Sequence, residues 1–193
     1  MQALTRDDLL SLEDYARRRA DFRAEAMVHK RPRRVAIGPH TALYFEDRLT
    51  IQYQIQEMLR VERIFETAGI QDELDAYNPL IPDGDNWKAT FMVEIEDVDE
   101  RRDALARLIG IEDHVWVQTG DGAKVYAIAD EDLERENADK TSSVHFLRFQ
   151  LPDACRQALK QQAPVHIGID HPEYSYTLEL DDAQRAALVA DLD

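Results

Sequence analysis

His40, Tyr44 and Glu46 are predicted to share one face of a strand, where together they could carry out metal or proton chemistry. Side chains alternate along a regular strand, so residues two positions apart point the same way. An imidazole, a phenol and a carboxylate on one face could ligate a transition-metal ion or relay a proton. Glu57, on a helix expected to follow, and His145, on a later strand, could complete the set of ligands.

A simpler interpretation of these residues needs no ligand, and the pattern favours it. Glu46 would pair with Arg48 at the start of the following helix, while Tyr44 packs. Exposed pairs of this kind stabilise a fold by only about 0–1 kcal/mol. His145 shares its strand face with apolar side chains in the segment 147–151, which favours a hydrogen-bonded core or edge histidine.

Five further residues could bind a small anionic metabolite. Four of them are cations that could contact a negatively charged ligand, and the fifth is a tryptophan that could stack on it. They are Arg34, Arg48, Arg60, Lys88 and Trp87. The alternatives are that the cations decorate the surface and that the tryptophan, beside a strand, packs in the core.

An acidic stretch between residues 72 and 88 is a third candidate. Its five carboxylates and two carboxamides could hold a hard cation such as calcium or magnesium. Their spacing is not that of a calcium-binding loop, and Asp and Asn are also the usual residues of turns. The turn interpretation is therefore favoured.

The chain carries no strong catalytic motif. It has no phosphate-binding Gly-rich loop, no Gly-x-Ser-x-Gly elbow and no His-Glu-x-x-His. Whether it is an enzyme therefore stays open at this point, and so does the identity of any cofactor beyond a transition-metal ion.

Composition limits the classes of partner. The net charge of −16 argues against binding to nucleic acid or to an anionic membrane surface. No run of 18 apolar residues is present, and the first residues do not read as a secretory signal. A single cysteine, Cys155, cannot form an internal disulfide. We therefore expect a cytoplasmic protein with neither nucleic-acid nor membrane partners.

Hydrophobic periodicity predicts helices in the first part of the chain. A capping-box pattern begins at Thr5 and predicts a first helix that Pro32 ends. Short strands follow at 35–37 and 41–45, and the longest helix is expected over 49–75, with Gly69 able to stop or kink it. A proline-containing loop at 78–86 follows.

The second part of the chain reads as strands joined by short helices. Strands are expected at 89–95, 115–117, 125–129, 144–151, 165–169 and 174–180, and helices at 99–109, 130–138, 153–162 and 181–192. Several connections are too short for parallel crossovers, which predicts an α+β fold with a mostly antiparallel sheet, a long helix after the first strand and flanking helices. We expect one domain over 1–193, with a seam at 78–86 between a helix-rich and a β-rich part.

Five blocks of sequence resemble an uncharacterised family of bacterial proteins that is described as a domain of unknown function. They are LTRDDLL at 4–10, RVAIGPH at 34–40, FEDRLTIQYQIQEM at 45–58, AYNPLIPDG at 76–84 and VHFLRF at 144–149. The resemblance spans nearly the whole chain and so implies one architectural unit. Members of the family are encoded near rubrerythrin-like and iron–sulfur oxidoreductase genes, which implies an accessory role in redox or peroxide handling. It supplies no catalytic residues.

The leading hypothesis is a non-catalytic binding or accessory protein that works with a redox partner protein, and that could act as a homodimer. The alternating charges of Arg60, Glu62, Arg63 and Glu66 suit a partner-facing helix. The alternative is a small metal-binding protein or metalloenzyme that uses the histidine, glutamate and tyrosine ligands named first.

Overall fold

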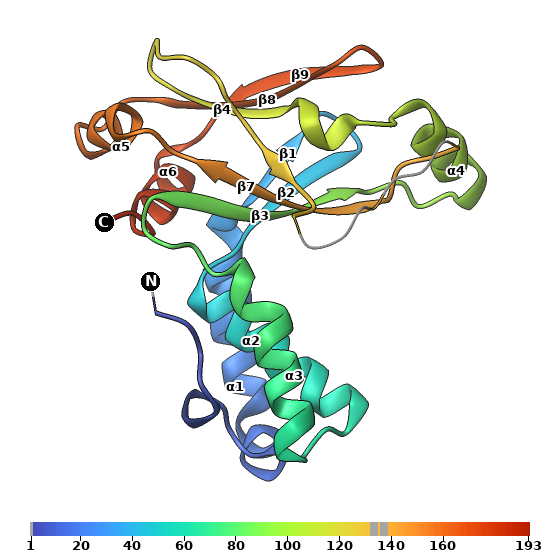
Figure 1. Ribbon diagram of the computed structural model, residues 1–193, viewed down its shortest axis with the longest axis vertical. Helices are drawn as coiled ribbons and strands as arrows, with labels where there is room; N and C mark the ends of the chain where they lie inside the picture. The colour runs from blue at the N-terminus through green and yellow to red at the C-terminus, as the bar shows by residue number, and fades with distance from the viewer. Residues whose placement is uncertain (1, 132–134, 136–138) are drawn as a thin grey trace.

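The computed structural model describes residues 2–131, 135 and 139–193. Three helices form an elongated arm, and two β-sheets with shorter helices form a body at one end of that arm (Figure 1). The C-terminus lies in the body close to the point where the arm joins it. The predicted helix at 130–138 lies largely outside the described residues.

The first helix of the arm begins later than the sequence predicts. Thr5 and Asp8 do form a capping box, but it closes a single 3₁₀ turn, η1 (Arg6–Asp8), because Leu9 is extended. Helix α1 (Leu12–Lys30) begins instead at Ser11, whose hydroxyl accepts a hydrogen bond from the backbone N–H of Asp14. Its end continues into a second 3₁₀ turn, η2 (Arg31–Arg33).

The single helix predicted over 49–75 is wrong, because the chain breaks it into α2 (Arg48–Glu62) and α3 (Thr67–Tyr77). The break is at Arg63, which adopts a left-handed conformation with φ of 56°. The Ile64 N–H then donates to the Leu59 carbonyl oxygen, a common way to end a helix. Gly69 lies within α3, where a Cβ atom would approach Ile64 Cγ2 to 2.7 Å. The glycine therefore permits close packing of Ile64 rather than causing the break.

Two antiparallel sheets form the body, which confirms the α+β fold class. The first, sheet A, has the order β1-β2-β3-β7-β6, and its strands are β1 (Arg34–Ile37), β2 (Thr41–Phe45), β3 (Asn86–Val93), β7 (Val144–Gln150) and β6 (Ile128–Ala129). The second, sheet B, has the order β5-β4-β8-β9, and its strands are β5 (Val125–Tyr126), β4 (Val115–Thr119), β8 (Val165–His171) and β9 (Tyr174–Glu179). Every strand pair in the described part of the chain is antiparallel.

Short helices flank the sheets. They are α4 (Val98–Arg107), α5 (Asp153–Lys160) and α6 (Asp182–Val189), with 3₁₀ turns η3 (Asn78–Leu80) and η4 (Ile111–His114). Strands β4 and β5 pair with each other across the turn that contains Gly120. The strand predicted at 144–151 is β7, which lies inside sheet A with β3 on one side and β6 on the other.

Buried apolar side chains form two clusters rather than one. The larger cluster fills the space between the sheets and includes Trp87, Phe91 and Phe149. The smaller cluster joins the arm helices α2 and α3 to the chain start and includes Ile55 and Leu74. The larger cluster also includes Val35 and Phe45, which precede 78–86 in the chain. The seam at 78–86 and the organisation as one domain both stay predictions.

Candidate functional site

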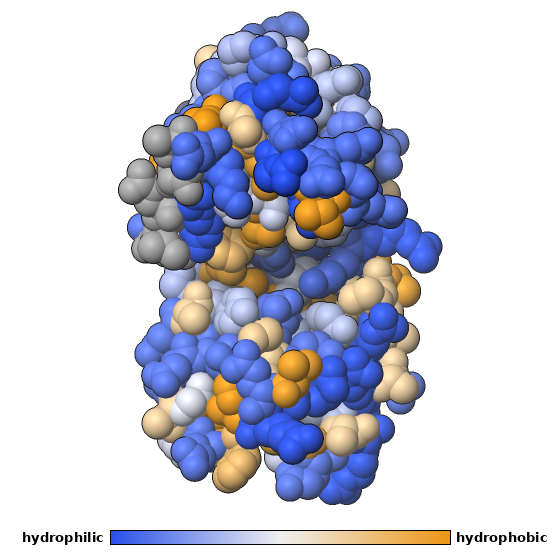
Figure 2. All heavy atoms as spheres, turned by 90° about the vertical axis from the view of Figure 1, so that its right-hand side faces the viewer, coloured by the Kyte–Doolittle hydropathy of each residue, from blue (hydrophilic) through white to orange (hydrophobic). Residues whose placement is uncertain are grey.

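A groove of about 980 Å³ lies between the arm and the outer face of sheet A. Figure 2 shows the molecule hollowed between its helical and β-rich parts, with hydrophobic residues exposed there. The apolar lining comes from α2, α3, η3 and β7, and its side chains include Met58, Tyr77, Pro79, Leu80 and Phe146. Alternation along β7 explains the place of Phe146, because its neighbours on either side, His145 and Leu147, are buried.

Charged residues line the same groove, and acids outnumber bases. The acids are Glu73, Asp75, Asp83, Asp85 and Glu131, and the bases are Lys88 and Arg148. Both bases are already paired: Lys88 Nζ lies 2.8 Å from Asp83 Oδ2, and Arg148 donates two hydrogen bonds of 2.7 Å to the Glu131 carboxylate. The remaining acids give the groove an excess of negative charge.

The pKa of Glu73 shows this excess. Partial burial raises it above the usual value for a glutamate, and the nearby carboxylates of Glu62 and Asp72 raise it further. A carboxylate that is both partly desolvated and surrounded by like charges is stabilised by a cation brought close to it. This part of the groove therefore favours positively charged groups.

The chain itself places one cation against the groove. The Arg135 guanidinium lies over the Phe146 ring at 4.6 Å from the ring centre, within the range of a cation–π contact. It also pairs with Asp130, with Nη1 2.9 Å from Oδ1. A guanidinium held between an aromatic face and a carboxylate shows the kind of group that this surface can accommodate.

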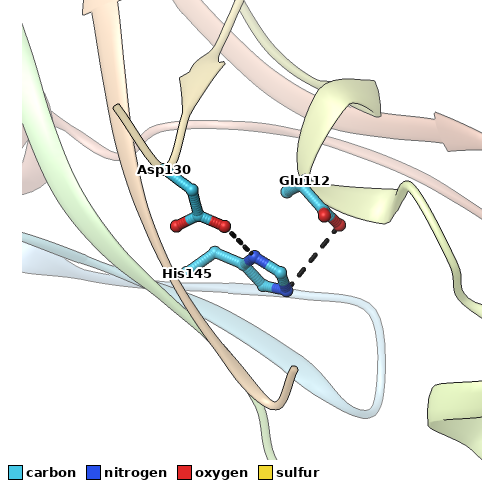
Figure 3. Close-up of side chains that lie close together, drawn as sticks. All are labelled: Glu112, Asp130 and His145. Atoms are coloured by element: carbon cyan, nitrogen blue, oxygen red, sulfur yellow. Dashed lines mark hydrogen bonds and ion pairs between the residues drawn. The ribbon is translucent and has the colours of Figure 1, made fainter. Parts of the chain in front are cut away.

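A second candidate lies on the inner face of β7, where His145 is completely buried between two carboxylates (Figure 3). Asp130 follows β6, and its Oδ2 lies 2.6 Å from His145 Nδ1. Glu112 comes from η4, and its Oε2 lies 3.7 Å from His145 Nε2. The Thr141 hydroxyl lies 2.9 Å from the same nitrogen. The preference for a hydrogen-bonded core histidine therefore agrees with this geometry.

The five residues predicted to share a metal are not brought together. His40 is exposed beside the acidic residues that precede and begin α4. The Tyr44 hydroxyl bonds to Glu94 and Arg34, and Glu46 accepts from Thr50 and Thr90. Glu57 lies on the arm, where it bonds to Tyr15 and Arg19 of α1. The Tyr44, Glu46 and Glu57 side chains thus have separate partners, several of them distant in the chain, and of the five residues only His145 lies in a buried cluster with acids.

The proposed anion-binding set is also dispersed. Each of three arginines is paired with a different carboxylate: Arg34 with Glu94, Arg48 with Asp8, and Arg60 with Glu57. Stacking by Trp87 on a ligand is excluded, because its side chain is buried in the core. There its Nε1 donates to the Leu188 carbonyl oxygen over 2.9 Å. Of this set, only Lys88 lines the groove.

Sequence reasoning did not single out Glu112 or Asp130. Neither lies near His145 in the chain, so no spacing motif connects them. The available signal was His145 itself, the one polar residue on the inward face of a hydrophobic strand. The acidic stretch at 72–88 was identified, and four of its acids line the groove. The turn interpretation is wrong for Asp72, Glu73 and Asp75, because they lie in helix α3.

Comparisons with known proteins place the chain without assigning an activity. The family described as proteins of unknown function (DUF3501) matches residues 3–192. A crystal structure of a protein of unknown function from Burkholderia pseudomallei has 55% sequence identity over 100% of both chains, with a TM-score of 0.95. No curated protein matches the chain. In the described part of the chain, no helix is both long and apolar enough to cross a membrane.

Proposed function

The chain belongs to the family of proteins of unknown function named above, and we propose that it is a binding protein whose groove holds a basic, partly apolar segment of a partner protein. The observation that carries the proposal is an apolar floor under an acidic rim whose two cations are already paired. Apolar contacts supply most of the binding free energy at such surfaces, while complementary charge selects the partner and speeds association.

The groove suits a protein segment because its walls come from separate elements. The arm contributes Met58 and Tyr77, and the sheet contributes Phe146. An occupant must therefore contact two faces at once, as a peptide with apolar side chains on one face does. Lysine or arginine side chains of that peptide would reach Glu73, Asp75 and the other unneutralised acids of the rim.

The net charge of −16 means that the protein as a whole, and not only the groove, attracts basic partners. A strongly acidic protein attracts basic partners over roughly a Debye length, about 8 Å at physiological ionic strength. The redox link that the family resemblance implies stays a prediction, and so does homodimer formation. The proposal itself defines the partner only by its chemistry.

A peptide-binding measurement tests this proposal. The probe is a short fluorescent peptide with alternating apolar and lysine or arginine positions, and the comparison peptide carries glutamate in place of each cation. We expect the basic peptide to bind with a saturable change in anisotropy and the acidic peptide to bind at least about tenfold more weakly, a difference of ~1.4 kcal/mol.

A charge-matched pair of variants locates the binding. Glu73→Lys combined with Asp75→Lys reverses the groove rim, while Asp99→Lys combined with Asp103→Lys makes the same change on α4, where both carboxylates are exposed. The groove variant should lose binding and the α4 variant should keep it. Equal loss in both variants would mean non-specific attraction to an acidic protein and would contradict the proposal. Binding of neither peptide, or concentration-dependent self-association blocked by the groove variant alone, would contradict it as well.

A further inference from the structure

Strand β9 (Tyr174–Glu179) forms an open edge of sheet B. It ends the strand order β5-β4-β8-β9, so β8 pairs with only one of its two sides. With six residues it is the longest edge strand in the described part of the chain, since β1 has four residues and β5 and β6 have two each. Figure 1 shows β9 at the outer margin of the body. A free edge of this length can pair with a further strand.

The register of the sheet shows which backbone groups of β9 are free. The Leu180 N–H donates to the Val165 carbonyl oxygen, and every second residue before Leu180 therefore bonds to β8. The residues between them are Ser175, Thr177 and Glu179, which direct their N–H and C=O groups away from β8. In the described part of the chain these backbone groups have no hydrogen-bond partner, and all three residues are exposed. The edge thus presents a row of alternating donors and acceptors.

The strand carries none of the features that usually keep an edge from pairing. Its sequence, YSYTLE at 174–179, contains no lysine and no proline, and its register with β8 is continuous, without a bulge. Tyrosine and threonine favour strands, and the Tyr176 side chain is 43% exposed. Natural sheets block an edge that must stay free with charge, proline, a bulge or a covering element. This edge is therefore suited to being covered by another strand.

We propose that β9 pairs with β9 of a second copy of this chain, in antiparallel orientation about a two-fold axis at Thr177. Opposite residues in an antiparallel pair exchange both N–H···O bonds when their backbone groups point at each other. The axis places Thr177 opposite Thr177 of the second copy, and Ser175 opposite Glu179 on either side. These are the residues whose backbone groups are free, so the pairing satisfies all of them. A two-fold contact of this kind closes at two copies.

The side chains fit the same register. On the outer face it pairs threonine with threonine and Ser175 with Glu179, so no like charges lie opposite each other within the strand. On the inner face it places the exposed Tyr176 ring against Leu178 of the second copy. Residues in such non-hydrogen-bonded pairs approach most closely, and aromatic and hydroxyl pairs of this kind stabilise sheets.

The neighbouring registers fit less well. An axis at Tyr176 would place Glu179 beyond the end of the second strand, opposite Glu173, where two carboxylates repel. An axis at Leu178 would leave the backbone groups of Ser175 without a partner inside the strand. Both registers therefore make fewer hydrogen bonds than the one centred on Thr177.

Repulsion between two acidic copies gives the pairing a characteristic salt dependence. Each copy has a net charge of −16, and the acids that flank the strand, Glu173 and Asp181, would lie near each other across the pair. Salt screens this repulsion, so association should strengthen as ionic strength rises. Binding of a basic peptide in the groove should weaken under the same change. The pairing does not rest on the groove, which lies against sheet A.

Analytical ultracentrifugation of the full chain tests the association. We expect a monomer–dimer equilibrium with a Kd of about 1–100 μM, as a small interface gives, and a lower Kd at high salt. Thr177→Pro removes the outward N–H at the axis and leaves the bonds to β8 in place, because an edge strand tolerates proline there. Thr177→Lys keeps that N–H but sets two ammonium groups opposite each other. Each variant should weaken association by at least about tenfold.

Ala36→Lys is the matched control, because Ala36 is exposed on β1, an edge strand of the other sheet. It should leave the association unchanged. A wild-type chain that stays monomeric at every protein and salt concentration would overturn the proposal. So would association that survives both Thr177 variants.

Amide hydrogen exchange of the wild-type chain, resolved by NMR, tests the register without any variant. The N–H groups of Tyr176 and Leu178 bond to β8 and should exchange slowly at all protein concentrations. Those of Ser175, Thr177 and Glu179 should exchange fast in dilute solution and slowly once the dimer forms. A dimer in which these three amides still exchange fast would show that another surface holds it, and would overturn the assignment to β9.

Discussion

Arg33 and Asp191 form a buried ion pair with two parallel hydrogen bonds, Nη1 to Oδ2 at 2.7 Å and Nη2 to Oδ1 at 2.8 Å. The two residues are 158 positions apart and connect η2, the 3₁₀ turn that follows the arm helix α1, to the turn after α6. Asp47, which caps α2, lies 2.9 Å from the same guanidinium. Burial alone would lower the pKa of Arg33, but the hydrogen bonds and charges of these carboxylates raise it.

Replacing Arg33 with methionine should destabilise the protein by about 3–5 kcal/mol. The change leaves two buried carboxylates without their cation, which costs far more than the loss of an exposed pair. Urea denaturation measures the free energy of unfolding. Arg17→Met is the matched control on the same helix, because Arg17 pairs with Asp14 at the surface with 75% of its side chain exposed. It should change stability by no more than about 0.5 kcal/mol. Equal effects would contradict a structural role for the buried pair.

The same pair leads us to predict that the arm and the body unfold together. Trp87 and Trp116 both lie in the sheets, so tryptophan fluorescence reports the body, whereas far-ultraviolet circular dichroism reports chiefly the helices. For one cooperative unit, both signals change at the same urea concentration. An arm that melts at lower urea than the body would show two domains instead of the single domain expected from the sequence.

Glu57 should make the stability of the arm depend on pH. Hydrogen bonds from Arg19 lower its pKa from 4.5 to about 2 against the effect of burial, with help from Tyr15 and Arg60. A lowered carboxylate pKa stabilises the fold above the unfolded value and loses that effect as pH falls towards the folded value. Glu57→Gln should therefore cost about 1–2 kcal/mol at pH 7, a figure reduced for partial exposure, and the difference from wild type should shrink between pH 4.5 and 2. Glu25→Gln, on the exposed side of α1, is the control and should change the free energy of unfolding at pH 7 by no more than about 0.5 kcal/mol.

Gly168 in β8 should tolerate no larger residue. A Cβ atom there would lie 2.4 Å from Trp116 Cζ2 and 2.8 Å from the Tyr176 carbonyl oxygen. Gly168→Ala should therefore destabilise the protein by at least about 2 kcal/mol in thermal unfolding. Gly110→Ala separates crowding from backbone strain, because Gly110 has φ of +79° but no atom within 4 Å of the added Cβ. It should cost about 1 kcal/mol, and a larger loss there than at Gly168 would contradict the packing of sheet B.

Local patterns were enough to predict most strands, and topology decided the rest. Ala89, Phe91 and Val93 are predicted to share one strand face, with Thr90 on the other, and the sheet buries them as that alternation predicts. No glycine or proline marks the end of α2 at Arg63. Hydrophobic periodicity therefore predicted, wrongly, that the helix continues past this residue.

The candidate sites were less predictable because they join distant segments. His145 could be placed on an inward strand face, but Glu112 reaches it from a 3₁₀ turn and Asp130 from the end of β6. The groove likewise brings Tyr77 of α3 beside Phe146 of β7. No local sequence pattern predicts that Tyr77 and Phe146 lie side by side. The residue types and charges at 72–88, in contrast, did indicate the acidic rim.

The most direct test of the binding groove uses the methyl groups of the four methionines as reporters. Met58 lines the groove, whereas Met27 is exposed on α1. With methyl-labelled methionine, titration of the basic peptide should shift the Met58 NMR signal in a saturable way and leave Met27 in place. A Met58 signal that stays unchanged when the peptide is fully bound would contradict the account.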